Sequence, residues 1–183
     1  MMSDSKVGLT SSQTIGPFFK YGLAWQDGEQ AFPEGATGTA IEISGTLVDG
    51  AGKPISDAMI EFWQADATGN FGGPTQGSCA GFARAYTNPQ GGFVLRTRKP
   101  GPVAGADGKL QAPHILVCLF SRGMLKHLFT HIYFGDEPAN GQDPVLRAAG
   151  ARAETLIARP AGAGKYAWDM VLQGERETVF LDL

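Results

Sequence analysis

Residues 81–97 read GFARAYTNPQGGFVLRT, and this stretch indicates the fold class more clearly than any other. Gly81–Thr87 and Phe93–Thr97 are both strand-like, with aromatic and β-branched residues placed among small and polar ones. Between them lies Asn-Pro-Gln-Gly-Gly at 88–92, a combination typical of turns. We therefore predict two strands that close a hairpin with a longer loop.

Short strand-like segments separated by turn residues occur on both sides of this stretch. They lie at residues 41–44, 58–63, 114–121, 128–134 and 166–172. Helical patterns do not alternate with them, which argues against a parallel α/β sheet. Asp143 and Pro144 fit the N-cap and first turn of one short helix through about Ala149. The sequence thus predicts an all-β sandwich with one short helix.

The bulk composition is that of one globular domain, since 43% of the 183 residues are hydrophobic and 18% are charged. We expect an extended N-terminal arm over residues 1–38 and the sandwich over residues 39–183. The net charge of −3 is spread along the chain, so no nucleic-acid or polybasic membrane surface is expected.

The first residues, MMSDSKVGLTSS, lack the charged-then-apolar pattern of a signal peptide, and no apolar run approaches membrane length. We therefore expect a cytoplasmic protein. Neither Cys79 nor Cys118 belongs to a CxxC pair, so the cysteines give no zinc or thioredoxin-like signal. Cys118 lies among apolar residues and is interpreted as a core residue, not a nucleophile.

His114 stands at the entrance of a predicted strand, where metal ligands are common, but a ligand needs companions. Residues two apart on a strand face the same side, and the partner position of His114 is Leu116, which has no donor atom. His131 and Tyr133 do have this spacing. A new metal site of His114, His131 and Tyr133 therefore stays open, against the simpler interpretation of hydrogen-bonded side chains on a sheet face.

Several motifs in chain order resemble the intradiol ring-cleavage dioxygenases, from the arm to the last residues. They are SQTIGPF at 12–18, EFWQAD at 61–66, RTRKPGP at 96–102, APHI at 112–115, ETLIA at 154–158 and QGERETVF at 173–180. This resemblance implies a transthyretin-like or immunoglobulin-like β-sandwich. It also implies a non-haem Fe(III) held by two tyrosines and two histidines in the iron-bearing members of the family.

The positions that match these four ligands are largely without donor atoms in this chain. They are Phe71, Val103, His114 and Leu116. Phe, Val and Leu replace two anionic oxygens and one imidazole, and a lone neutral histidine cannot hold Fe(III). The resemblance is thus to a non-iron alpha chain, with Fe(III) expected on a partner beta chain and no metal on this one.

The resemblance further implies that this chain lines the cavity in which the partner cleaves protocatechuate with O₂. Carried over by motif, the substrate-binding positions are Thr14, Gly16, Pro17 and Arg122. A cation and hydroxyl donor suit a substrate carboxylate, glycine allows close approach of the backbone, and proline stiffens the arm. Two alternatives remain: a divergent single-chain metal-dependent catechol dioxygenase, and a transthyretin-like binding module without chemistry.

Overall fold

The computed structural model describes residues 9–16, 18–72, 80–105 and 108–182, and this part of the chain is mostly β. The strands are β1 (Ala40–Val48), β2 (Met59–Trp63), β3 (Phe82–Tyr86), β4 (Gly92–Arg98), β5 (Val103–Ala104), β6 (Leu110–Gln111), β7 (His114–Phe120), β8 (Leu128–Phe134), β9 (Ile157–Gly162), β10 (Lys165–Ala167) and β11 (Met170–Val171). The helices are α1 (Phe19–Leu23) and α2 (Pro144–Ala149), with 3-10 turns η1 (Pro138–Gln142) and η2 (Gly150–Leu156). The mostly-β composition predicted from the sequence is confirmed.

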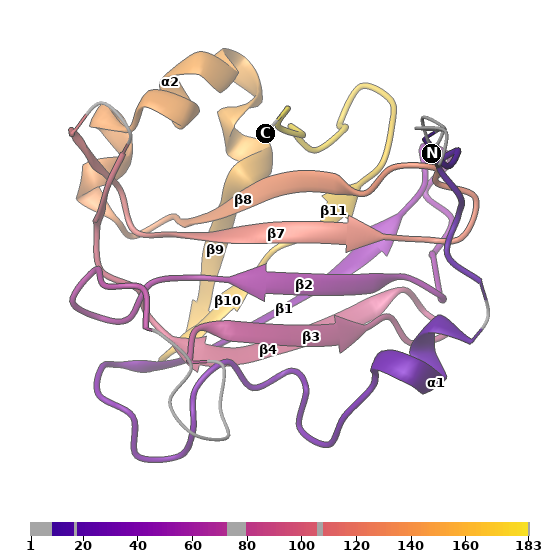
Figure 1. The fold of residues 1–183 in the computed structure, drawn as a ribbon. Helices are drawn as coiled ribbons and strands as arrows, with labels where there is room; N and C mark the ends of the chain where they lie inside the picture. Colours follow the sequence, from indigo (N-terminus) through magenta and orange to yellow (C-terminus); the bar gives the residue numbers. More distant parts are fainter. Residues whose placement is uncertain (1–8, 17, 73–79, 106–107, 183) are drawn as a thin grey trace, which may run out of the picture.

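One large sheet contains almost all of the strands. Its order is β11-β1-β10-β9-β8-β7-β2-β3, and β4 pairs with β1 off this path. Figure 1 shows β8, β7, β2 and β3 as one layer, with β9, β10 and β1 crossing behind it. The sheet therefore curls back on itself, and its two ends, β3 and β4, approach each other.

The predicted hairpin of residues 81–97 is wrong in its pairing, although both strands exist. β3 pairs with β2, whereas β4 pairs with β1. The turn between them is tight, because the Asn88 side chain accepts hydrogen bonds from Gln90 N and Gly92 N. An apolar face does not decide which strand lies alongside, so β3 and β4 need not pair with each other. Here the turn between them connects the two ends of the curled sheet.

Residues 28–31 lie across the opening between these two ends. Arg84 N donates to Gly28 O at 2.7 Å, and Arg96 N donates to Glu29 O at 2.9 Å. Ala31 N in turn donates to Arg96 O at 2.9 Å. This short segment of the predicted arm thus hydrogen-bonds to both sheet ends and nearly closes the sheet.

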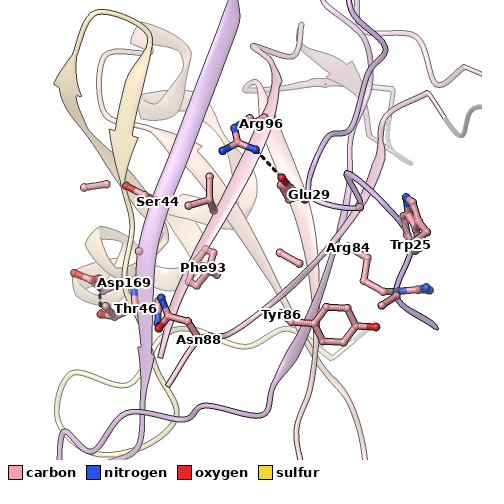
Figure 2. A pocket seen from close by; sticks show the side chains of 17 residues that line it. Trp25, Glu29, Ser44, Thr46, Arg84, Tyr86, Asn88, Phe93, Arg96 and Asp169 are labelled. Carbon is pink, nitrogen blue, oxygen red and sulfur yellow. Dashed lines mark hydrogen bonds and ion pairs between the residues drawn. The ribbon is translucent and has the colours of Figure 1, made fainter. Parts of the chain in front are cut away.

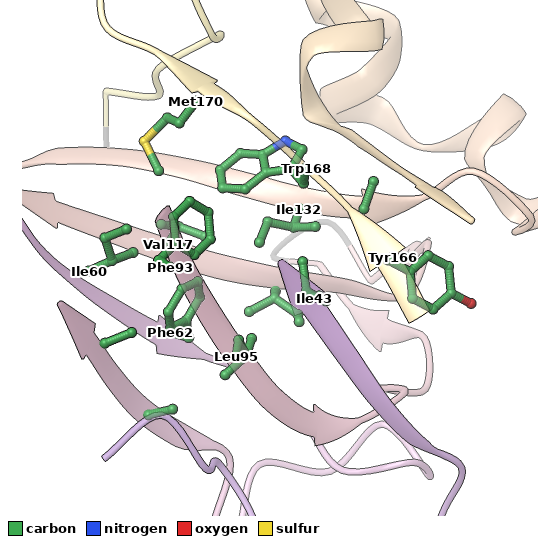
Figure 3. Packing of buried hydrophobic residues seen from close by; sticks show 14 of the residues in the cluster. Ile43, Ile60, Phe62, Phe93, Leu95, Val117, Ile132, Tyr166, Trp168 and Met170 are labelled. Atoms are coloured by element: carbon green, nitrogen blue, oxygen red, sulfur yellow. The ribbon is translucent and has the colours of Figure 1, made fainter. Parts of the chain in front are cut away.

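The main core lies between the two layers and draws on alternate residues of the strands (Figure 3). In β7 the inward positions are fully buried, and the outward ones are half-buried. The members of this core include Ile43, Phe62, Phe93, Leu95, Val117, Ile132 and Trp168. Burial of such side chains is worth roughly 1.5–3 kcal/mol each, which makes this core the main source of stability.

The strand predicted over residues 166–172 is interrupted at Trp168 and Asp169. A Cβ on Gly45 would lie 1.6 Å from Trp168 O, so only glycine allows β1 to approach this carbonyl. Asp169 Oδ1 accepts hydrogen bonds from Thr46 N and Oγ1, at 2.9 and 2.7 Å. At this break the Asp169 side chain, and not a backbone carbonyl, accepts the hydrogen bond of Thr46 N. The break separates β10 from β11.

The predicted helix after Asp143 is confirmed as α2, but the prediction of a single helix is incomplete because the arm contains α1. Farther along the predicted arm, Ala31 and Phe32 are buried in the main core. Within the residues that the structure describes, no helix is long and apolar enough to cross a membrane.

Candidate functional site

Thr14 attaches the N-terminal arm to the connection between β7 and β8. Its Oγ1 accepts a hydrogen bond from Gly123 N at 2.7 Å. This contact joins residues that are 109 positions apart in the sequence. It places the arm beside Arg122, the cation that sequence reasoning assigned to the same site.

A cavity of about 230 Å³ lies between the arm, helix α1 and the ends of β2 and β3. Gly16 and Arg122 both line it. Of the four predicted substrate-binding residues, the structure thus brings together Thr14, Gly16 and Arg122, whereas Pro17 lies outside the described residues.

Arg122 is held at the cavity by an ion pair. Its Nε lies 2.8 Å from Asp57 Oδ2, and Asp57 lines the same cavity. A guanidinium has five N–H donors, and the Nε contact uses one of them. The guanidinium is therefore oriented by Asp57 and keeps donors for a second anion.

A larger cavity of about 750 Å³ lies at the opening between the two sheet ends (Figure 2). Its walls mix apolar residues with two polar pairs: Arg96 pairs with Glu29 at 2.6 Å, and Thr46 binds Asp169. Tyr86 lines both cavities. None of the predicted substrate-binding residues in the described part of the chain lines this larger cavity.

The positions that match the family's iron ligands lie on and beside the outward face of β2 and β7. Phe71 stacks on Trp63, with ring centroids 6.3 Å apart, and Trp63 is the cross-strand partner of Leu116. Gly101 N donates to Asp66 O at 2.8 Å, which joins the loop before Phe71 to the turn before Val103. The local framework of the site is therefore present, but three of its four positions carry hydrocarbon side chains.

His114, His131 and Tyr133 do converge, as the single-chain metal alternative requires. The rings of His114 and His131 stack at 4.5 Å, and His131 Nδ1 lies 3.2 Å from Tyr133 Oη. Tyr133 Oη donates to Asp143 Oδ1 at 3.0 Å, so its oxygen accepts the His131 Nδ1 proton. Sequence reasoning had assigned Asp143 only as a helix N-cap.

Asp143 is the anchor of this network. Its Oδ2 accepts from Ala112 N at 2.9 Å, while its Oδ1 also accepts from Val145 N and Leu146 N. His114 Nδ1 donates to the carbonyl of Ala112 at 2.8 Å, which ties the strand entrance to the same network.

The electrostatics of the network favour its neutral forms. Burial, followed by the charge of His114, lowers the pKa of His131 to about 3, and burial also lowers the pKa of His114. Burial and the nearby Asp143 raise the pKa of Tyr133 well above its ordinary value. Fe(III) needs tyrosinate and converging lone pairs, so a hydrogen-bonded phenol and two stacked imidazoles do not fit this ion.

The described residues contain no group of three or more His, Cys, Asp or Glu side chains with metal-binding geometry. Cys118 is half-buried on β7 opposite Glu61, and burial raises the pKa of its thiol to about 12. A thiol with so high a pKa is a poor nucleophile. The predicted place of Cys118 in the core is wrong, because it lies among the half-buried outward positions of β7. Cys79 lies outside the described residues.

Comparison with known proteins gives a consistent result. The family described as Dioxygenase matches residues 15–174. The chain is 42% identical to the protocatechuate 3,4-dioxygenase alpha chain of Burkholderia cepacia, over 95% of this chain and 97% of that one. It is 28% identical to the beta chain of the same organism's enzyme, over 77% of this chain and 67% of that one. Among solved structures, a dioxygenase domain from Streptomyces sp. SirexAA-E superposes with a TM-score of 0.63 at 27% identity, over 82% and 88% of the two chains.

Proposed function

This chain belongs to the intradiol ring-cleavage dioxygenase family, and on that premise we propose that it is the alpha chain of a protocatechuate 3,4-dioxygenase. The reaction opens the ring of protocatechuate between its two hydroxyls with O₂ and gives 3-carboxy-cis,cis-muconate. The observation that carries the proposal is that Gly16 and Arg122 line one cavity, while Thr14 binds Gly123, the residue next to Arg122.

The role proposed for this chain is substrate binding, since Phe71, Val103 and Leu116 stand at three of the four positions that match the family's iron ligands. Arg122 offers a charge-assisted contact for the substrate carboxylate, because Asp57 orients its guanidinium and leaves donors available. Gly16 has no neighbour within 4 Å of a notional Cβ, so this wall of the cavity is open to an incoming ring. Pro17 belongs to the proposed site by motif alone.

We place the Fe(III) on a partner beta chain. The hydrocarbon side chains at Phe71, Val103 and Leu116 and the engaged Nδ1 of His114 support this placement. The similarity to an alpha chain and, at lower identity, to a beta chain supports two related chains in one assembly. We propose the finer fold assignment, a transthyretin-like sandwich over residues 39–183 with an arm over residues 1–38, on the same grounds.

The N-terminal segment offers the surface for this partner. Tyr21, which lines the cavity, is 83% exposed, and Phe18, at the start of the same helix, is 80% exposed. Large apolar side chains gathered at one place on a surface favour an interface. The cavity therefore opens toward the side on which we place the beta chain.

The test is co-expression of this chain with a beta chain of the family, followed by co-purification and measurement of protocatechuate-dependent O₂ uptake. We expect a stable complex that consumes O₂ with protocatechuate, whereas the alpha chain alone does not. Failure to form a complex, or a complex inactive toward protocatechuate, would contradict the proposal. Removal of residues 1–16 is a second check, because the complex should lose activity with the arm.

A further inference from the structure

The cavity beside Arg122 contains a polar atom that has no partner. The hydroxyl oxygen of Tyr86 is buried, and no hydrogen-bond partner for it lies among the described residues. Burial raises the pKa of this phenol, so the hydroxyl keeps its proton and can donate it. Native proteins satisfy nearly all buried polar atoms, which makes an unpaired hydroxyl in a cavity wall a feature to explain.

A cation without a carboxylate partner lies over the ring of the same tyrosine. The ammonium group of Lys20 lies 5.6 Å from the centroid of the Tyr86 ring, and both residues line the cavity. No carboxylate among the described residues forms an ion pair with Lys20, and the nearby Asp57 is already paired with Arg122. The positive charge of Lys20 is therefore available to a ligand.

The rest of the cavity wall suits an aromatic ring. Ile15, Phe19 and Met59 give it an apolar side, and its volume of about 230 Å³ is sufficient for one substituted benzene. A neutral donor and a free cation in the same cavity wall as these apolar residues match an aromatic carboxylate. A neutral catechol without a carboxylate would leave both polar groups unsatisfied.

We propose that Tyr86 and Lys20 are specificity-determining residues that bind the carboxylate of the substrate together with Arg122. The inference rests on the proposed function and adds two residues to its site. Sequence reasoning did not find them, because Tyr86 belongs to a sheet strand and Lys20 to a segment without a recognisable motif.

The test compares substrates with and without the carboxylate in the assembled alpha–beta enzyme. Tyr86→Phe removes only the hydroxyl, and Lys20→Met keeps the aliphatic stem over the ring. Each variant should lower kcat/KM for protocatechuate about tenfold and leave kcat/KM for catechol unchanged. Inhibition by 4-hydroxybenzoate should weaken in the same proportion, whereas inhibition by phenol should not change.

The matched control is Lys165→Met, an exposed lysine on β10 outside this cavity. It should not change the ratio of kcat/KM for the two substrates. If Tyr86→Phe and Lys20→Met leave the ratio of kcat/KM for protocatechuate to kcat/KM for catechol unaltered, the inference is overturned. Equal losses for both substrates are one such result. The proposed function would still stand in that case, because the parent enzyme is active. A parent complex inactive toward protocatechuate would overturn the proposed function itself.

Discussion

The hydroxyl of Tyr133 donates a hydrogen bond of 3.0 Å to Oδ1 of Asp143, and both side chains are buried. This contact links the outward face of β8 to the first turn of helix α2, because the same oxygen caps Val145 and Leu146. His114, at one of the positions that match the family's iron ligands, is tied to the same network through the carbonyl of Ala112. We infer that the network stabilises the fold.

Asp143→Ala should lower the free energy of unfolding by roughly 2–4 kcal/mol. It removes the N-cap of α2 and leaves Ala112 N and Tyr133 Oη as buried donors without acceptors. Chemical denaturation of the purified chain or complex measures the change. Glu137→Ala is the control, since Glu137 caps an exposed 3-10 turn and its loss should cost less than about 1 kcal/mol.

Stability should fall as the pH is lowered from about 6.5 toward 3. The folded pKa of His131, about 3, lies below its ordinary value of 6.5, so the unfolded chain binds more protons in this window. One such group contributes a slope of at most about 1.4 kcal/mol per pH unit. His131→Asn retains a donor near the Nδ1 position but does not titrate in this range. Its free energy of unfolding, measured by denaturation at pH 7, 6 and 5, should therefore change less with pH than that of the parent. An equal slope in His131→Asn and in the exposed control His127→Asn would contradict this assignment.

Gly45→Ala should destabilise the fold by about 2 kcal/mol or more, because its Cβ would collide with Trp168 O. The backbone of β1 would have to move away from β10, with loss of the contacts at the Asp169 break. Gly141→Ala is the control, since nothing lies within 4 Å of its notional Cβ. Thermal unfolding of both variants gives the comparison, and equal melting temperatures would refute the steric argument.

Arg122→Ala in the assembled enzyme should lower kcat/KM for protocatechuate by about ten- to a hundredfold, the value of a lost charge-assisted contact. Arg176→Ala is the control, because Arg176 lines a different hollow beside β11. Steady-state kinetics of the two variants tests the difference. Kinetics of Arg122→Ala equal to those of the parent would remove this residue from the site.

The sequence predicted the strands well because alternating apolar residues mark a buried face whichever strand lies alongside. It did not predict the pairing of β3 and β4, because hydrogen-bond partners depend on how the whole sheet curls. The break at Trp168 depends on the close approach of Gly45, a contact between segments more than a hundred residues apart. Such long-range contacts leave no local pattern.

The site was predicted in the same uneven way. Arg122 and Gly16 came from motifs, and the structure placed them at one cavity. Asp143 was identified only as a cap because its N-cap role is local, whereas its bonds to Ala112 and Tyr133 depend on the fold. Tyr86 was missed for the same reason, since its unpaired hydroxyl is apparent only in three dimensions.

The central claim is that this chain contributes a substrate-binding wall and its partner contributes the iron. Iron content and visible absorbance, measured on the chain alone and on the chain co-expressed with a beta chain, test it most directly, because tyrosinate bound to Fe(III) is coloured. We predict a colourless, iron-free single chain and a coloured, iron-containing complex that cleaves protocatechuate. Stoichiometric iron and colour on the single chain would contradict the claim and direct attention to His114, His131 and Tyr133.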